Sequence, residues 1–361
     1  MASEKQEVLN QFRFSRMIWP ILIGLSVLAY AIYQINQVDL SMDQVLQYTT
    51  WSNVLKWAGI GFLCMIGRDL GYIIRMRILT DKKLSWRAAF EVTLLWEFSS
   101  ALTPSIVGGS AVAIFMLLKE KISLGRSTAI IFITIFLDEV FYVLTLPIAL
   151  IWIGHEALFN PVGEIESSIG TGLITAFWIA YGVIVAYTIF LAFALFIRPE
   201  GTSRVFRRLF KTRLLKRWED RGDKMAEDLL TASYEFRTKP VAYWAKAFGA
   251  TVMAWMGRYL VLNCVLAAFT NLSLYEHTVA FGRQAIMFVV MIVSPTPGSS
   301  GIAEGAFTNL FSEFAPPSLT PGDEVLAFML ILATVWRLIT YYPYVLIGVP
   351  LLPRWISRVF K

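Results

Sequence analysis

The amino-acid sequence predicts an all-α polytopic membrane protein with six spanning helices and two membrane re-entrant hairpins, arranged as an inverted repeat. Of its 361 residues, 57% are hydrophobic and only 16% are charged, whereas soluble domains carry about 25% charged residues. Several apolar runs reach the roughly 20 residues that a bilayer core requires. Two further apolar stretches are interrupted by proline and glycine, which end a continuous helix.

Spanning helices are predicted where long apolar runs are bounded by charged or polar segments. The predicted spans are 17–35, 54–76, 124–152, 170–197, 246–270 and 325–349. The two interrupted stretches are 88–118 and 283–311. Pro104, Gly108 and Gly109 lie in the first break, and Pro297, Gly298 and Gly301 lie in the second.

The distribution of lysine and arginine predicts the orientation, because cytoplasmic segments of membrane proteins are rich in both. The segments without lysine or arginine are 36–53, 153–168, 271–282 and 312–324, and we place them outside. The basic segments are 1–16, 77–87, 119–126, 198–246 and 350–361, and we place them in the cytoplasm with both termini. Each interrupted stretch then begins and ends at one face, which predicts a hairpin. The alternative is that each stretch crosses completely.

The order of these segments predicts two membrane repeats, 17–152 and 170–349, with opposite orientations. Gly67-Arg68 in the second predicted span has a counterpart in Gly257-Arg258 of the fifth. The basic segment 198–246 carries 13 basic and 7 acidic residues, a net charge of +6. It either forms an interfacial helix against anionic headgroups or is an ordinary connecting loop.

Charged side chains at predicted membrane depth call for a partner or a purpose, because each costs at least about 2.5 to 3.5 kcal/mol there. They are Arg68, Asp69, Glu97, Asp138, Glu139, Arg258, Glu304 and Arg337. We expect Arg337 to pair with Asp138, Glu139 or Glu304, and the group to line a cavity beside the two breaks. Either this group forms a polar pathway, or its salt bridges only hold the bundle together.

The helix breaks add a second expectation, because the N-terminus of a half-helix offers free amide groups to an anion such as phosphate. No cofactor or metal site is expected. The two cysteines and two histidines show no metal-ligand spacing. The sequence contains none of the usual catalytic motifs, so it does not suggest an enzyme, although a membrane enzyme that uses scattered acidic and basic residues stays open.

The run Pro297-Gly298-Ser299-Ser300-Gly301-Ile302-Ala303-Glu304 resembles the Pro-Gly-Gly-x-Gly-x-x-Glu motif of the flippase-like transmembrane domain of lysylphosphatidylglycerol synthases. The resemblance covers roughly residues 15 to 350. It implies a stand-alone protein of the bacterial inner membrane that translocates a lipid between leaflets, with Glu304, Arg337 and the hairpin glycines at motif positions. Ser299 replaces a motif glycine.

The sequence also contains no soluble aminoacyl transferase domain. The expected partners are therefore membrane lipids, either an anionic phospholipid or a glycolipid. Nucleic acid is not expected, and homo-oligomerisation stays open. The alternatives are a lipid-modifying enzyme, an accessory to polyprenyl-linked sugar transfer, and a structural or regulatory membrane partner.

Overall fold

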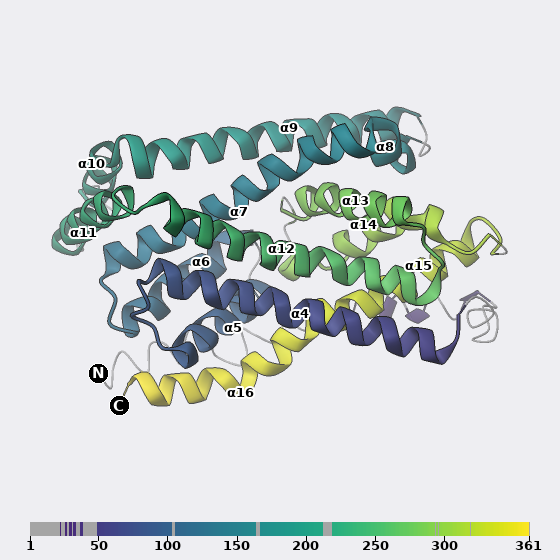
Figure 1. The fold of residues 1–361 in the computed structure, drawn as a ribbon, viewed down its shortest axis with the longest axis horizontal. Helices are drawn as coiled ribbons and strands as arrows, with labels where there is room; N and C mark the ends of the chain where they lie inside the picture. Colours follow the sequence, from purple (N-terminus) through teal and green to yellow (C-terminus); the bar gives the residue numbers. More distant parts are fainter. Residues whose placement is uncertain are drawn as a thin grey trace.

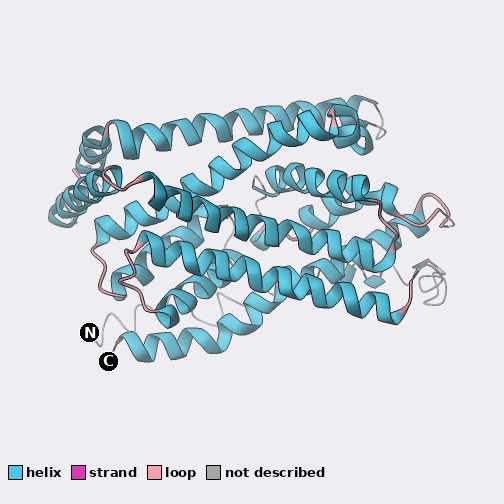
Figure 2. Ribbon diagram, viewed as in Figure 1, coloured by secondary structure: helices cyan, strands magenta, loops and turns pink. Residues whose placement is uncertain are grey.

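The computed structural model describes residues 49–102, 105–163, 167–211, 219–292, 294, 296–317 and 319–360, together with residues 22, 26, 29, 30, 32, 33, 37 and 38. These residues form helices joined by short loops and contain no strand, which confirms the predicted all-α class (Figure 2). Most of the predicted first span, 17–35, lies outside the described residues.

The helices follow one another through short connections, and hydroxyl groups cap several of them. The side chains of Thr50, Ser85 and Ser123 accept amide hydrogen bonds of 3.3, 3.1 and 3.4 Å at the starts of α4, α5 and α7. In chain order the described elements are α4 (Trp51–Leu79), α5 (Trp86–Leu102), α6 (Ser105–Lys119), α7 (Leu124–Ile153), α8 (His155–Gly163), α9 (Ser167–Ala192), a π-helical turn η1 (Phe193–Ile197), α10 (Pro199–Phe210), α11 (Glu219–Arg237), α12 (Val241–Phe269), α13 (Leu274–Ile292), a 3-10 turn η3 (Pro297–Ser299), α14 (Ile302–Phe311), a 3-10 turn η4 (Ser312–Phe314), α15 (Asp323–Thr340) and α16 (Tyr342–Val359).

Helices α4 and α12 pack side by side along their length (Figure 1). Their backbones approach closely at two glycines. A Cβ atom on Gly257 would lie 2.6 Å from the carbonyl oxygen of Cys64, and one on Gly71 would lie 2.8 Å from the carbonyl oxygen of Ala250. Small residues permit this spacing between apolar helices. Gly67, the other glycine of the repeated Gly-Arg pair, faces open space.

Each interrupted stretch folds into a pair of packed helices, α5 with α6 and α13 with α14. The residues before α5 and after α6 lie close together, because Asp81 before α5 forms a 2.6 Å ion pair with Arg126 in the first turn of α7. For the second pair, the rings of Phe269 before α13 and Phe328 after α14 lie 6.4 Å apart. The two pairs lie toward opposite ends of the bundle (Figure 1).

The last predicted span, 325–349, falls within the apolar stretch Asp323–Val359, which is long enough to cross a membrane. This stretch consists of two helices, α15 and α16, which meet at Tyr341, rather than of one continuous helix. Pro343 lies in the first turn of α16 and has no amide hydrogen to continue the hydrogen bonding of α15. The segment 350–361, expected as a tail, continues α16 as far as Val359.

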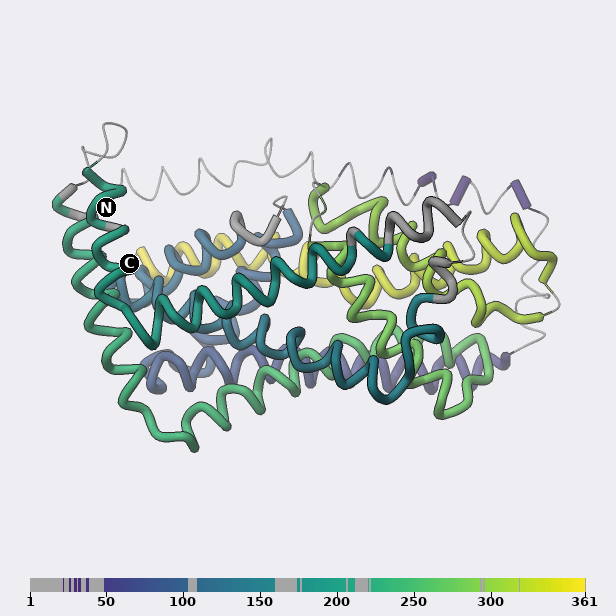
Figure 3. Tube along the Cα trace, turned by 90° about the horizontal axis from the view of Figure 1, so that it is seen from above, coloured from purple at the N-terminus to yellow at the C-terminus, as the bar shows by residue number. Residues whose placement is uncertain are grey.

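Helices α10 and α11, from the basic segment 198–246, stand across one end of the bundle (Figures 1 and 3). They pack against each other, and the hydroxyl of Tyr234 donates to the carboxylate of Glu200, which lowers the pKa of that carboxyl. Val205 and Leu209 on α10 are exposed. Since the apolar residues of α10 share one face, the helix has the pattern of an interfacial helix, and that role stays a prediction.

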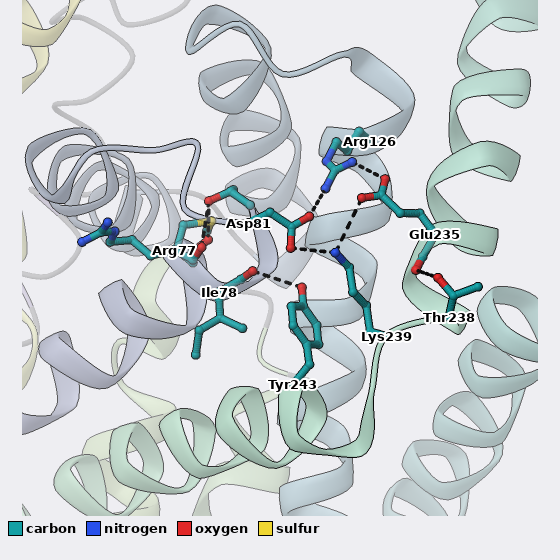
Figure 4. A network of polar contacts seen from close by, with 10 residues as sticks. Arg77, Ile78, Asp81, Arg126, Glu235, Thr238, Lys239 and Tyr243 are labelled. Carbon is teal, nitrogen blue, oxygen red and sulfur yellow. Dashed lines mark hydrogen bonds and ion pairs between the residues drawn. The ribbon is translucent and has the colours of Figure 1, made fainter.

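A polar network ties α11 to the transmembrane bundle (Figure 4). Asp81 accepts hydrogen bonds from Arg126 at 2.6 Å and from Lys239 at 2.8 Å. Glu235 near the end of α11 pairs with the same two cations. The hydroxyl of Tyr243 donates to the carbonyl oxygen of Ile78 at 3.1 Å. The ends of α4 and α11 and the starts of α7 and α12 are thereby held together.

Five stretches of the described chain are long and apolar enough to cross a membrane. They are Trp51–Leu79, Leu124–Ile153, Phe177–Ile197, Val241–Phe269 and Asp323–Val359. Large apolar side chains are exposed on α4, α7 and α9, among them Phe62, Leu63, Ile148, Ile151, Ile189 and Phe190. Exposed apolar surface on this scale suits contact with lipid rather than with water.

The close approach of α4 and α12 predicts that Gly257→Ala destabilises the protein. The added methyl group meets backbone atoms that cannot move alone, and overpacking of this kind costs about 1 to 3 kcal/mol. Gly249→Ala on the same helix is the control, because its Cβ would meet nothing within 4 Å. Thermal unfolding of the detergent-solubilised variants measures the difference. Equal melting temperatures for the two variants would contradict this packing.

Candidate functional site

A cavity of about 300 Å³ lies within the helix bundle, beside the breaks of the two hairpins. Ser100 and Ala101 near the end of α5 line it, together with Gly298 and Ser299 of η3. Side chains from α4, α7, α12, α13, α15 and α16 complete the wall. The cavity combines aromatic rings with arginine and carboxylate side chains, as polar binding sites at membrane depth do.

One carboxylate, Glu97 of α5, holds two arginines in the wall of this cavity. Its Oε2 accepts a hydrogen bond from Arg68 of α4 and another, 3.2 Å long, from Arg258 of α12. Arg68 is fully buried, while a quarter of the Arg258 side chain is exposed. The guanidinium of Arg258 also lies over the rings of Trp255 and Phe288, at 5.0 and 5.5 Å from their centres. Such cation–π contacts fix its direction.

A second set of contacts surrounds Arg68. The hydroxyl of Tyr344 on α16 accepts a hydrogen bond from Arg68 and donates one of 2.7 Å to Asp69. Asp69 also accepts a 2.9 Å hydrogen bond from Arg68. The ring of Tyr72 lies between two guanidinium groups, 5.0 Å from that of Arg68 and 4.9 Å from that of Arg75. Helices α4, α5 and α16 therefore share one polar cluster.

Asp138 of α7 is paired with Arg75 of α4, a residue that the sequence analysis left out of the site. The second carboxylate oxygen accepts from Arg75 Nη2 at 3.1 Å, so the contact is bidentate. The indole of Trp255 donates to Asp138 at 2.7 Å, and Arg75 donates to the hydroxyl of Thr251 at 3.0 Å. Asp138 is therefore the one of the three candidate partners of Arg337 that is held by an arginine of α4 instead.

Arg337 of α15 pairs with Glu304 of α14 at 2.7 Å, which confirms one of the three partners predicted for it. It also donates to the carbonyl oxygen of Gly298 in the turn η3 at 2.8 Å. Glu304 in turn accepts a 2.6 Å hydrogen bond from the amide of Gly301 at the start of α14. This amide is therefore already capped by a side chain of the protein. The expectation that the N-terminus of this half-helix offers free amides to an anion is corrected at Gly301.

Tyr341, between α15 and α16, joins the two breaks. Its hydroxyl donates to the carbonyl oxygen of Ala101 in α5 at 3.1 Å. Its ring fills the space beside Gly298, where an added Cβ would lie 2.3 Å from the ring. Gly298 has a φ of +56°, a conformation that glycine adopts without strain. The turn of the second hairpin is thereby held against the first.

Six of the fourteen residues that the sequence proposed for the site line the cavity: Glu97, Asp138, Glu139, Arg258, Gly298 and Arg337. Arg68, Asp69 and Glu304 lie directly behind this wall and bond to it, and the amide of Gly301 bonds to Glu304. Pro297 is buried in η3. Gly109 serves the contact between α6 and α5, where a Cβ would touch Ser100. Gly108 lies in the first turn of α6, and Pro104 lies outside the described residues.

Residues that the sequence analysis missed include Arg75, Tyr72, Trp255, Tyr341 and Tyr344. A signal for Arg75 existed. It follows Arg68 by seven residues, so both lie on one helix face. Arg75 is the next-to-last residue of the predicted span 54–76 and was not among the candidates, whereas α4 continues to Leu79. Within the described residues, no group of three or more histidine, cysteine, aspartate or glutamate side chains is placed to hold a metal ion.

The pair of Arg337 and Glu304 predicts a large loss of stability for Arg337→Ala. Removing one partner of a buried ion pair costs about 3 to 5 kcal/mol, because the other charge is stranded. Arg337→Lys keeps the charge and should lose less, although a single ammonium group cannot reproduce both contacts. The matched control is Arg204→Ala on α10, since Arg204 is exposed. Thermal unfolding is the measurement, and equal melting temperatures for Arg337→Ala and Arg204→Ala would contradict the pairing.

Comparison with known proteins agrees with this arrangement of apolar helices. Residues 17–348 match the family described as the lysylphosphatidylglycerol synthase TM region. A UPF0104 membrane protein from Archaeoglobus fulgidus is 24% identical over 340 residues, which cover 91% of this chain and 93% of that protein. The match to the family extends over most of the chain, and the chain is therefore a membrane protein that belongs to the family of lysylphosphatidylglycerol synthase transmembrane regions.

Proposed function

We propose that the protein transports a lipid between the two leaflets by passing its headgroup through the cavity. The observation that carries this proposal is a cavity of about 300 Å³ with arginines in its wall, enclosed by helices whose outer surfaces are apolar. Polar groups at this depth need either an internal partner or a polar ligand. A lipid headgroup is a polar ligand whose acyl chains can stay in the surrounding bilayer.

Arg258 is the best placed contact for an anionic headgroup. A quarter of its side chain is exposed, against 4% for Arg75 and 7% for Arg337. It holds Glu97 through a single 3.2 Å hydrogen bond, and Glu97 keeps Arg68 as a second partner. Arg258 can therefore turn part of its guanidinium toward a phosphate without leaving a carboxylate unpaired. This supports an anionic phospholipid, or a glycolipid linked through phosphate, as the transported molecule.

The arrangement of the helices supports six spans, two re-entrant hairpins and an inverted repeat. Five candidate spans lie within the described residues, and the span predicted at 17–35 would be the sixth. The hairpins α5–α6 and α13–α14 lie toward opposite ends of the bundle, as hairpins that enter from opposite faces would. Helices α4 and α12, the central helices of the two proposed halves, pack against each other. Transporters of this type bind substrate between such halves.

We place the end with α10 and α11 in the cytoplasm, because 198–246 has a net charge of +6. The membrane that we propose is the bacterial inner membrane, as the family resemblance implies. The proposed partners are membrane lipids.

The proposed function predicts that reconstituted protein moves a fluorescent anionic phospholipid between leaflets and that Arg258→Gln slows this exchange. A hydrogen bond to a charged group contributes about 1.5 to 3 kcal/mol, so its loss should slow exchange by roughly tenfold or more. Arg258→Gln should still fold, since Glu97 keeps Arg68. The readout is the fraction of label that dithionite reduces over time in proteoliposomes.

Arg204→Gln is the control for this assay, because it removes an arginine that lies outside the cavity. Exchange by the wild-type protein that equals exchange in protein-free vesicles would contradict the proposed transport. A headgroup that is chemically altered without changing leaflet would indicate a lipid-modifying enzyme instead. Exchange at wild-type rate by a folded Arg258→Gln protein would remove Arg258 from the pathway.

The proposed hairpins predict which loops share a face of the membrane. In a background without Cys64 and Cys264, Lys83→Cys and Lys121→Cys flank the first hairpin, while Asn271→Cys and Thr320→Cys flank the second. An impermeant maleimide applied to one side should label the first two cysteines together, and the last two only from the other side. Labelling of Lys83→Cys and Lys121→Cys from opposite sides would mean that α5 and α6 cross completely.

A further inference from the structure

Glu139 of α7 is a buried carboxylate that lines the cavity and has an oxygen without a partner. The residue is 8% exposed. Its Oε2 atom is buried and makes no hydrogen bond within the part of the chain that the structure describes. The neighbouring Asp138, by contrast, is held by Arg75 and Trp255. Of these two adjacent carboxylates, Asp138 is paired with an arginine, whereas Glu139 has a buried oxygen without a hydrogen bond.

Each arginine that lines the cavity with Glu139 is already paired with another carboxylate, and α6, which packs against α7, contributes only Ser110 among its described residues to the cavity wall. On α4, Arg75 forms a salt bridge with Asp138. On α12, Arg258 forms a salt bridge with Glu97, and Tyr259 carries only a hydroxyl group. Helix α9 contributes Tyr187, which interacts electrostatically with Glu139, and α13 contributes the amide of Gln284 to the cavity. Helix α15 contributes Arg337, which is paired with Glu304.

The charges of the cavity and of the layer behind it balance only when Glu139 is neutral. Four arginines (Arg68, Arg75, Arg258 and Arg337) are matched by four carboxylates (Asp69, Glu97, Asp138 and Glu304), all of them joined by salt bridges. An ionised Glu139 would be a fifth negative charge, which gives 4 − 5 = −1. Such an unpaired charge is unfavourable in a low-dielectric interior and next to Asp138.

We propose that Glu139 binds a proton together with the anionic headgroup, so that lipid and proton are transported as one unit. This inference rests on the proposed lipid transport. In the loading step, hydronium on one side of the membrane gives its proton to a carboxylate oxygen of Glu139, an O–H bond forms, and water is released. In the unloading step the O–H bond breaks and water on the other side takes the proton.

The sign of this coupling follows from the charge balance. A headgroup with one negative charge enters a neutral wall when Glu139 is protonated and a wall of charge −1 when it is ionised. Headgroup binding therefore favours protonated Glu139, and protonation favours headgroup binding by the same factor. Affinity for the anion should be highest at low pH and should fall as pH rises through the pKa of Glu139.

The experiment measures binding of a short-chain phosphatidylglycerol to the detergent-solubilised full chain by isothermal titration calorimetry as a function of pH. Its phosphodiester stays ionised throughout, so changes in affinity report on the protein. We expect the wild-type dissociation constant to rise by about 5- to 150-fold from acidic to alkaline pH, the usual range of coupling between two sites. Glu139→Gln, which mimics the protonated acid, should bind at all pH values as tightly as wild type at low pH.

Two further variants make the result decisive. Glu139→Asp keeps a titratable group and should keep the pH dependence, which a purely structural role would not require. Glu227→Gln on α11 is the control, because Glu227 is exposed and lies outside the cavity. The same pH profile in folded Glu139→Gln and in wild type would overturn the coupling while leaving lipid transport intact. No binding and no leaflet exchange by wild type at any pH would overturn the proposed function together with this inference.

Discussion

Glu97 accepts hydrogen bonds from arginines on two different helices, and the cavity depends on this shared carboxylate. Without it, Arg68 would keep only Asp69 as a counter-charge, and Arg258 would have none among the contacts the structure describes. Stranding a buried charge in this way costs several kcal/mol. Because Glu97 lies in the first hairpin while the arginines lie on α4 and α12, the same contact fixes the hairpin against this pair of helices.

An ion pair also fixes the second hairpin, and here the arginine balances the charge of the carboxylate that caps the helix after the turn. Glu304 caps the first turn of α14, and Arg337 then balances the charge of Glu304 and holds the turn η3 through Gly298. Together these contacts make a rigid wall. Among the arginines that line the cavity, the most exposed is Arg258 on α12. The carboxylate oxygen without a hydrogen bond belongs to Glu139 on α7. A bound headgroup would meet both.

Several features of this structure could be predicted from the sequence. The helical class follows from long apolar runs, and the helix breaks follow from proline and glycine, whose effects are local. The charged residues that the sequence singled out lie in or behind one cavity wall, because charge is rare and costly at membrane depth. What could not be predicted is which charges pair. Of the three candidate partners, Glu304 pairs with Arg337, whereas Asp138 bonds to Arg75, a residue outside the candidate set. This pairing depends on how α4, α7 and α12 cross.

Aromatic residues of the cavity were missed for a related reason. Tyr341 lies at the junction of α15 and α16 and Tyr344 lies in the first turn of α16, and a single straight helix over 325–349 would point them elsewhere. Trp255 and Tyr72 looked like ordinary apolar residues in the sequence, and only their contacts with Asp138 and with the guanidinium groups give them a polar role. Composition alone does not distinguish such a side chain from one that faces lipid.

The most direct measurement is photo-cross-linking with a phospholipid that carries a diazirine in its headgroup, followed by mass spectrometry of the labelled peptides. Headgroups that enter the cavity should label residues in its wall, such as Trp96 and Ser100 on α5 and Met287 on α13. An excess of unlabelled anionic lipid should suppress this labelling. Cross-links confined to residues on the outer surface, such as Phe62 on α4 and Ile189 on α9, would contradict passage of the headgroup through the cavity.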